Sequence, residues 1–168
     1  MSDGKLLNEA RALRYMIDAV EDVLAAEVLL ERGVFGQSLF HCQQVSEKAS
    51  KACLSILGFV LADEHKYANF LQKMVVPNSG KLRSDFTKLM VKVSVLETLY
   101  ITSRYGVDKQ GRIHFKEFEE KDVSDVFNAV QDFIELCFKF LEDKLQKQIP
   151  RTKEKLILYV KTNYKELL

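Results

Sequence analysis

Apolar positions recur along most of the chain with the period of an α-helix. Three- and four-residue steps carry an apolar stripe through residues 8–31, 35–60, 81–103 and 123–145. A stripe of this period buries one face of a helix and leaves the other face to water. The pattern therefore predicts four long helices that pack against one another.

Two shorter segments extend this pattern. Asp63 is placed to cap a helix that continues to Met74, and Thr152 is placed to cap a last helix that continues to Leu167. Residues 156–160 alone also fit a strand, but a lone strand would have no partner in a helical chain. The last segment is therefore predicted to be a helix.

The expected fold is all-α. It is an up-and-down bundle of about five core helices in residues 1–150, with an appended C-terminal helix in residues 151–168 of the same domain. With 168 residues and 47% apolar content, the chain fits one domain that needs no metal or disulfide to fold. Its seven glycines and two prolines are too few to favour an all-β or disordered chain.

Glycine and proline positions set the expected ends of these helices. Gly33 is expected to end the first helix, and Pro150 to stop the last of the long helices. Gly58 is expected only to weaken the last turn of the second helix, which should continue two residues beyond it. Loops are expected at residues 77–80, which read Pro-Asn-Ser-Gly, and at residues 106–116, which carry two glycines among alternating charges.

The first helix is apolar on more than one of its faces. The residues involved are Tyr15, Met16, Ala19, Val20, Val23, Leu24, Ala26 and Leu30. A helix with this pattern is buried on two sides, and a bundle of this size has a limited interior to hide it. We therefore expect a homodimer.

The cysteines and the N-terminus indicate the compartment. Cys42, Cys53 and Cys137 lack Cys-x-x-Cys spacing and fall on apolar helix faces, so they are expected to be reduced, buried packing residues. No apolar stretch near the N-terminus is long enough for a signal peptide, and no run approaches the ~20 residues of a membrane span. The expected localisation is cytoplasmic, without a membrane partner.

Charge is nearly balanced overall but unevenly distributed. The formal net charge of +1 gives no field across the molecule that would capture nucleic acid, so it does not indicate RNA as a partner. Residues 1–35 hold seven acids against four bases, whereas residues 144–168 hold seven bases against two acids. The C-terminal end is therefore the positive end of the chain.

The segment 43–51 separates polar chemistry from packing. With an advance of about 100° per residue, one narrow arc of a helix contains Gln37, Gln44, Lys48 and Lys51, with Glu47 and His41 at its edges. The opposite arc is apolar. Amides and ammonium groups are donors and cations, which suit a phosphate or a partner surface. The alternative is a solvated face on which residues four apart support the helix.

Three further residues carry candidate chemistry. Arg104 and Tyr105 follow the expected end of a helix, where a guanidinium can bind phosphate through two hydrogen bonds and a ring can stack on a base. Interaction with the helix dipole is the alternative role for the arginine. His65 offers either proton transfer or a capping hydrogen bond, and proton transfer needs a partner that the sequence does not identify.

These residues also carry a resemblance to a known family. The Gln-Gln-x-x-Glu-Lys-x-x-Lys run, the preceding Gly33-Val34-Phe35, His65 and the segment Tyr-Ile-Thr-Ser-Arg-Tyr at 100–105 resemble the HEPN (higher eukaryotes and prokaryotes nucleotide-binding) family over roughly residues 10–148. The resemblance implies an all-helical bundle, usually a dimer, associated either with nucleotide binding and a partner nucleotidyltransferase or with RNA cleavage. It also implies a nucleotide or phosphate site at Gln44, Lys48, Lys51, Arg104, Tyr105 and His65.

The chain departs from the ribonucleases of this family. Those enzymes resemble one another in an arginine followed, after about four to six residues, by a histidine near the dimer cleft, where the pair stabilises a phosphate and moves a proton. In this chain Arg32 lies too far before His41, Arg104 too far before His114, and Arg112 too close to His114. We therefore expect no metal-independent ribonuclease activity.

The function predicted from the sequence is a non-catalytic nucleotide- or phosphate-binding HEPN module that works as a dimer with a nucleotidyltransferase or another nucleic-acid-processing partner. ATP or GTP is the expected kind of ligand. No cofactor or metal is expected, because the chain has no Walker loop, zinc pair or Gly-x-Ser-x-Gly elbow. Two alternatives stay open: a toxin-like HEPN ribonuclease in which Arg104 meets His65 or His114 in space, and a protein-interaction module without a ligand.

Overall fold

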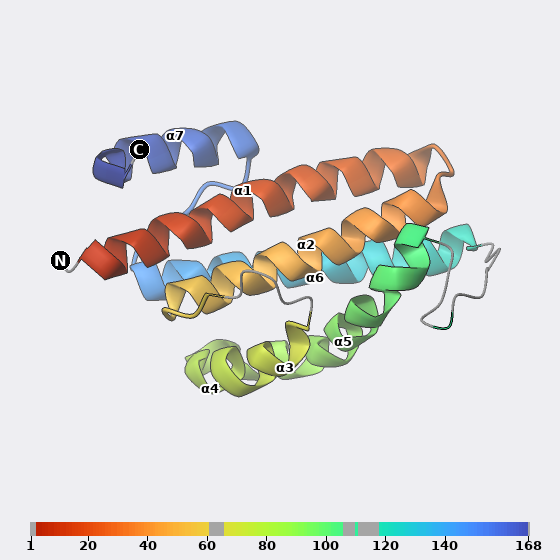
Figure 1. Cartoon of the computed structure of the whole chain (residues 1–168), viewed down its shortest axis with the longest axis horizontal. Helices are drawn as coiled ribbons and strands as arrows, with labels where there is room; N and C mark the ends of the chain where they lie inside the picture. Colours follow the sequence, from red (N-terminus) through yellow and green to blue (C-terminus); the bar gives the residue numbers. More distant parts are fainter. Residues whose placement is uncertain (1–2, 61–65, 106–109, 111–117, 168) are drawn as a thin grey trace.

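Helices make up the bundle in the computed structural model, which describes residues 3–60, 66–105, 110 and 118–167 (Figure 1). This confirms the all-α bundle, and no strand occurs among these residues. The helices of more than two turns are α1 (Asp3–Glu31), α2 (Phe35–Ile56), α5 (Arg83–Tyr105), α6 (Glu120–Leu145) and α7 (Lys153–Asn163).

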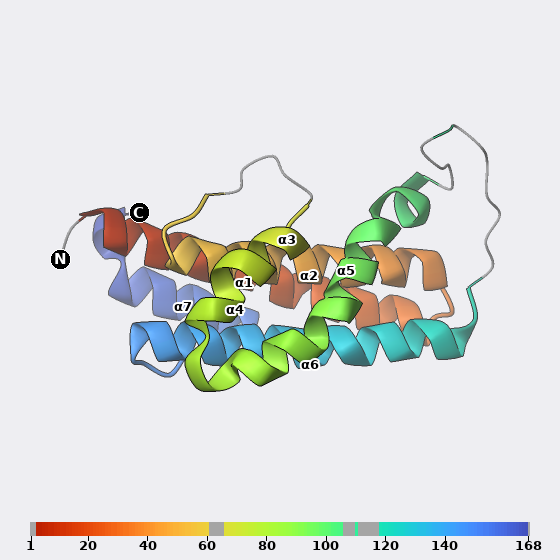
Figure 2. The ribbon, with the colours of Figure 1, turned by 90° about the horizontal axis from the view of Figure 1, so that it is seen from below.

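The second helix, α2, is the centre of the bundle. It forms a hairpin with α1 and packs against α5 and α6 on its other sides (Figures 1 and 2). Aromatic rings join α5 to α6, because Phe86 meets Phe133 and Phe140 edge to face, with centroids 6.5 and 5.7 Å apart. A helix enclosed in this way has little free surface, so the polar residues of α2 must find partners or reach a gap between neighbours.

Two glycines end the helices of the hairpin by the same motif. At Gly33 (φ +71°), as expected, the N–H groups of Gly33 and Val34 donate to the carbonyls of Leu30 and Leu29 at 3.0 and 2.8 Å. Gly58 (φ +91°) ends α2 likewise, two residues after Ile56. The expected continuation of α2 beyond this glycine was wrong, because the left-handed backbone that glycine accepts closes the helix there.

The segment between α2 and α5 contains a short irregular helix. It consists of α3 (Ala68–Phe70), the π-helical turn η1 (Leu71–Val75) and α4 (Val76–Asn78), followed by the 3-10 turn η2 (Gly80–Leu82). The expected loop at 77–80 was therefore partly wrong, because Pro77 and Asn78 are helical. The π turn ends two residues before Pro77 and is the kind of irregularity that accommodates a residue without an N–H. The predicted cap, Asp63, lies outside the described residues.

The C-terminal part begins where α6 ends, before the proline that was expected to stop it. Gln146 adopts a left-handed conformation (φ +54°) directly after α6, four residues before Pro150. Thr152 occupies the N-cap position of α7, as expected, but its side chain makes no capping hydrogen bond. The final helix stops at Asn163, and a separate 3-10 turn, η3 (Lys165–Leu167), follows it.

The last helix, α7, runs antiparallel along the N-terminal half of α1 (Figure 1). The Tyr164 hydroxyl donates to Glu9 at 3.1 Å, and the Lys153 ammonium pairs with Glu21 at 2.8 Å. One apolar face of α1 is thus covered by α2, and the other is covered by α7 over part of its length. The homodimer inferred from those faces stays a prediction.

Three further expectations concern the thiols, membranes and metals. The cysteines are buried and free, as expected, and burial raises the pKa of Cys42 to about 12. In the described part of the chain, no helix combines the length and apolarity needed to cross a membrane. The same residues contain no group of three or more His, Cys, Asp or Glu side chains placed to hold a metal ion.

Candidate functional site

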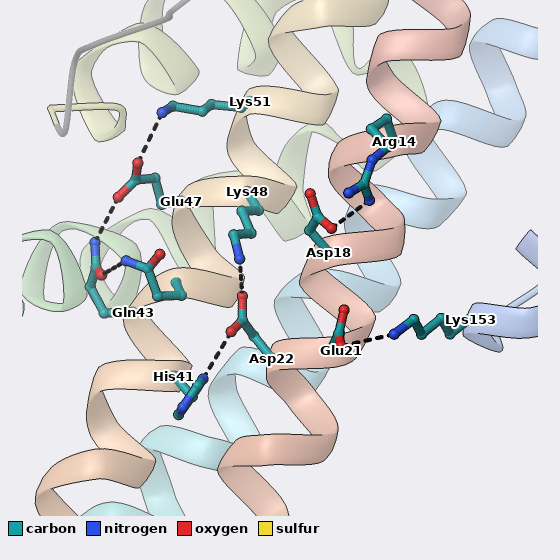
Figure 3. Close-up of polar contacts among 11 residues, drawn as sticks. Arg14, Asp18, Glu21, Asp22, His41, Gln43, Glu47, Lys48, Lys51 and Lys153 are labelled. Atoms are coloured by element: carbon teal, nitrogen blue, oxygen red, sulfur yellow. Dashed lines mark hydrogen bonds and ion pairs between the residues drawn. The ribbon is translucent and has the colours of Figure 1, made fainter. Parts of the chain in front are cut away.

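The polar side chains of α2 divide into two groups that leave the helix on different sides (Figure 3). His41 and Lys48 reach across to Asp22 of α1, and we call these three residues the Asp22 cluster. Gln43 and Lys51 meet at Glu47 on the other side, and we call these three the Glu47 network. The two groups differ in burial and therefore in the chemistry that they can do.

In the Asp22 cluster, one carboxylate holds two donors. Nδ1 of His41 lies 2.8 Å from Oδ1 of Asp22, and Nζ of Lys48 lies 2.5 Å from Oδ2. His41 and Lys48 are seven residues apart, close to two helical turns, so they project from the same face of α2. Their side chains are 26% and 29% exposed, whereas that of Asp22 is 11% exposed. A buried carboxylate thus orients two donors that still reach solvent.

This arrangement leaves donor capacity unused. An ionised carboxylate only accepts, so His41 donates through Nδ1 and its Nε2 is left to meet a ligand. Lys48 uses one of its three N–H groups on Asp22. Gln44 lies between them along α2 and is half-buried, but its amide turns toward the Glu47 network and donates to Oε1 of Gln43 at 2.7 Å. His41 and Lys48 can therefore hydrogen-bond a phosphate, and His41 can move a proton.

In the Glu47 network, both carboxylate oxygens are occupied. Nζ of Lys51 donates to Oε1 of Glu47 at 2.9 Å, and Nε2 of Gln43 donates to Oε2 at 3.1 Å. The side chains of Lys51 and Glu47 are 10% and 8% exposed. Burial of an ion pair is tolerated when both charges are paired and hydrogen-bonded. Lys51 is therefore held in an internal ion pair. The four-residue spacing indicated this pair as one alternative, but on a solvated face, so its burial was not expected.

Two more buried polar groups lie on this side, one on α2 itself and one directly before α3. The hydroxyls of Ser46 and Tyr67 are inaccessible, and neither has a hydrogen-bond partner among the described residues. Burial raises the pKa of Tyr67, and the Glu47 and Glu97 carboxylates add to the rise. Glu97 of α5 accepts a hydrogen bond from the backbone N–H of Ala68 at 2.7 Å. This side of α2 faces a polar interior rather than solvent.

The predicted site residues are distributed over these groups and over α5. Lys48 lies in the Asp22 cluster and Lys51 in the Glu47 network, and Gln44 donates to Gln43 of that network. Arg104 and Tyr105 are the last two residues of α5, whereas they were expected to follow the end of that helix. The last turns of α5 lie over the N-terminal half of α2 in both views (Figures 1 and 2). The side chains of Arg104 and Tyr105, and the whole of His65, lie outside the described residues.

Two residues of the Asp22 cluster were not predicted as a site. His41 was placed only at the edge of the polar arc, and Asp22 was not singled out. A usable signal exists in the hairpin, because residues equally far from its turn at Gly33 meet when the two helices run antiparallel. Asp22 lies eleven residues before this glycine, which places it opposite the α2 turn between His41 and Lys48.

Comparisons with known proteins place these residues in a family context. The HEPN domain family matches residues 12–148, which include both the Asp22 cluster and the Glu47 network and end before α7. A curated protein of Methanocaldococcus jannaschii, named "Putative toxin", is 28% identical over 132 residues. The matched region covers 75% of this chain and 85% of that protein. No solved structure matches the chain.

Proposed function

The chain belongs to the HEPN family, and we propose that it is a non-catalytic module of this family that binds a phosphate-bearing nucleotide at the Asp22 cluster. One observation carries the proposal: His41 and Lys48 form a partly exposed pair of donors on one helix face, and Asp22 orients both of them. Donors fixed in advance lose less conformational entropy when a phosphate binds them.

The proposal narrows the site expected from the sequence. Lys51 is removed as a direct ligand, because a phosphate would have to separate it from Glu47 in a nearly dry environment. Arg104 stays as the proposed second cation and Tyr105 as the proposed stacking ring. The position of the last turns of α5, over the half of α2 that contains His41, supports both assignments. His65 remains a proposal from the resemblance alone.

The toxin-related relative supports a wider setting for this binding. We propose that the chain works in a toxin-related system beside a nucleotidyltransferase or another nucleic-acid-processing protein.

We further propose a homodimer through the α5–α6 face. This face has a groove of about 450 Å³ in which Val91 is 72% exposed. Lys92 of α5 lies beside Asp125 and Asp132 of α6, so a second copy turned by a two-fold axis would pair opposite charges.

RNA cleavage is a second candidate, and one specific observation favours it. A carboxylate that fixes one ring nitrogen and leaves the other open is the arrangement that makes a histidine an effective general base. His41 and Asp22 have this arrangement. The missing arginine–histidine spacing still weighs against cleavage, so nucleotide binding without cleavage remains our proposal.

Melting scans of the full chain test the binding proposal. ATP, GTP or AMP should stabilise it relative to an ionic-strength control, by about 2.7 kcal/mol at a ligand concentration one hundred times the dissociation constant. Lys48→Ala and His41→Ala should remove the shift. Lys153→Ala is the matched control and should retain it, because this lysine is similarly exposed and also pairs with an acid of α1.

Three outcomes would overturn parts of the proposal. The site assignment fails when no nucleotide shifts the melting temperature, or when Lys48→Ala and Lys153→Ala behave alike. The non-catalytic assignment fails when the purified protein cleaves RNA in the presence of chelator and His41→Ala abolishes the cleavage. Light scattering tests the dimer, which should become a monomer on Val91→Asp.

A further inference from the structure

The last helix covers only half of an apolar stripe on α1. The contacts of α7 with α1 extend from Glu9, which binds Tyr164, to Glu21, which binds Lys153 at the start of α7. Figures 1 and 2 both show α7 beside the N-terminal half of α1, and none of the described helices continues the line of α7 along the C-terminal half. An apolar stripe on this side of α1 is therefore covered by α7 only as far as Glu21.

The stripe itself continues past that point. Ile17 and Glu21 are followed at three- and four-residue steps by Leu24 and Val28, so all four share one face of α1. Ile17 is 5% exposed, whereas Leu24 and Val28 are 53% and 54% exposed. Two apolar side chains that prolong a buried stripe into solvent mark an interaction surface better than scattered ones would.

Acidic residues flank this exposed part. Glu27 and Glu31 are exposed and run beside Leu24 and Val28 at the same four-residue spacing. Beyond Glu21 and Asp22, which pair with Lys153 and Lys48, residues 23–31 contain these two acids and no base. A segment that covers this surface therefore meets apolar side chains in the centre and negative charge at the edge.

The covered half of α1 shows which chemistry fits. Residues 153–163, which form α7, contain three lysines and one acid. The helix packs Leu156 into the core, and Lys153 pairs with Glu21. A second α1 in the same place would bring glutamates against glutamates, which is unfavourable.

We propose that the C-terminal half of α1, centred on Leu24 and Val28 and edged by Glu27 and Glu31, docks a basic amphipathic helix of a partner protein in line with α7. The available length, residues 22–31, accommodates about three helical turns, or roughly 15 Å. This inference is independent of nucleotide binding at the Asp22 cluster.

Fluorescence anisotropy with the full chain tests the docking surface. The probe is a labelled synthetic helical peptide with leucines on one face and lysines on its flanks, compared with a version that carries glutamates in place of the lysines. The lysine peptide should bind at least about tenfold more tightly than the glutamate peptide. Leu24→Ser and the double variant Glu27→Lys with Glu31→Lys should each weaken its binding about tenfold.

The matched control is Leu158→Ser. Leu158 is a leucine of α7 that is 65% exposed, and its replacement should leave peptide binding unchanged. The proposal is overturned when the peptide does not bind, when both peptides bind alike, or when Leu158→Ser and Leu24→Ser have the same effect. It is also overturned when light scattering shows a dimer that Leu24→Ser dissociates, because a second copy then covers this surface. The nucleotide-induced melting shift of Leu24→Ser should match that of the wild type, which separates this test from the nucleotide proposal.

Discussion

Lys48 and Lys51 lie one turn apart on the same arc of α2, yet they have different surroundings. Lys48 reaches Asp22 on another helix and is 29% exposed, whereas Lys51 pairs with Glu47 of its own helix and is 10% exposed. A helical wheel gives the direction of a side chain but not whether a neighbouring helix buries it. Because α2 lies at the centre of the bundle, its neighbours bury one side of the polar arc and leave the other side partly exposed.

This difference in burial should change how much the loss of each ion pair destabilises the protein. An ion pair that reaches water contributes little to stability, because solvent screens it and the side chains lose freedom. A buried pair also contributes little net free energy, but the loss of one partner leaves a charge without compensation. The following variants test whether the two groups of α2 differ in this way.

The largest effect is expected for Lys51→Ala. This change removes the Lys51 ammonium from a nearly buried ion pair with Glu47, so it should lower the free energy of unfolding by about 3 kcal/mol. Urea unfolding followed by circular dichroism measures the change. The double variant Lys51→Ala with Glu47→Gln should recover a large part of the loss. An effect of Lys51→Ala as small as that of Lys48→Ala would show that the burial difference has no energetic meaning.

A smaller loss is expected for Asp22→Ala. The variant removes the acceptor of two hydrogen bonds, but His41 and Lys48 can turn toward solvent, so the free energy of unfolding should fall by about 1.5 kcal/mol. A double-mutant cycle between Asp22 and Lys48 should give a coupling energy of about 0.5 to 1 kcal/mol. A loss as large as that of Lys51→Ala would mean that the Asp22 cluster behaves as a buried pair.

The buried side of α2 should also make stability depend on pH in the alkaline range, through Tyr67, which packs there. Burial raises the pKa of Tyr67, so in the folded protein its phenol stays neutral at a pH where the unfolded chain already ionises. Stability is therefore full below the ordinary value of about 10 and falls by up to about 1.4 kcal/mol per pH unit above it. Tyr67→Phe should remove this part of the alkaline loss.

Urea unfolding of wild type and Tyr67→Phe at pH 8 and pH 10.5 measures this difference. At pH 8 the phenylalanine variant should be at least as stable, because the Tyr67 hydroxyl has no hydrogen-bond partner among the described residues. Equal alkaline losses in the two proteins would contradict a buried, neutral phenol at this position.

The smallest stability effect is expected for Lys48→Ala. Its ammonium is partly exposed, so the free energy of unfolding should change by less than about 1 kcal/mol. The nucleotide-dependent melting shift should nevertheless disappear in this variant. A large stability loss without any effect on ligand binding would show that Lys48 stabilises the fold and does not bind the nucleotide.

Periodicity in the sequence was sufficient to predict the helical framework. The stripes over 8–31 and 123–145 gave two long helices, and Gly33 gave the turn between α1 and α2. The prediction failed at Gly58 and Pro77, where one backbone conformation and one π-helical turn decide the outcome. These are local choices that side-chain patterning does not encode.

The candidate site was less predictable, because it depends on contacts between helices. The arc that contains Gln44 and Lys48 was found from spacing alone, but in the structure Lys48 reaches Asp22 of α1, whereas Gln44 donates to Gln43 of the Glu47 network. The burial of Lys51 depends on what packs against α2, and the role of Asp22 depends on the register of the hairpin. Spacing within one helix carries neither kind of information.

The contact between Glu9 and Tyr164 has a consequence for the order of folding. These residues are 155 positions apart, whereas α1 and α2 form a hairpin across a short turn. Closing the longer loop loses more chain entropy, so the hairpin should form before α7 settles on α1. Tyr164→Phe should accordingly accelerate unfolding in stopped-flow experiments and leave the refolding rate nearly unchanged. Until that last step, the N-terminal half of α1 remains open to the nascent chain's other apolar segments.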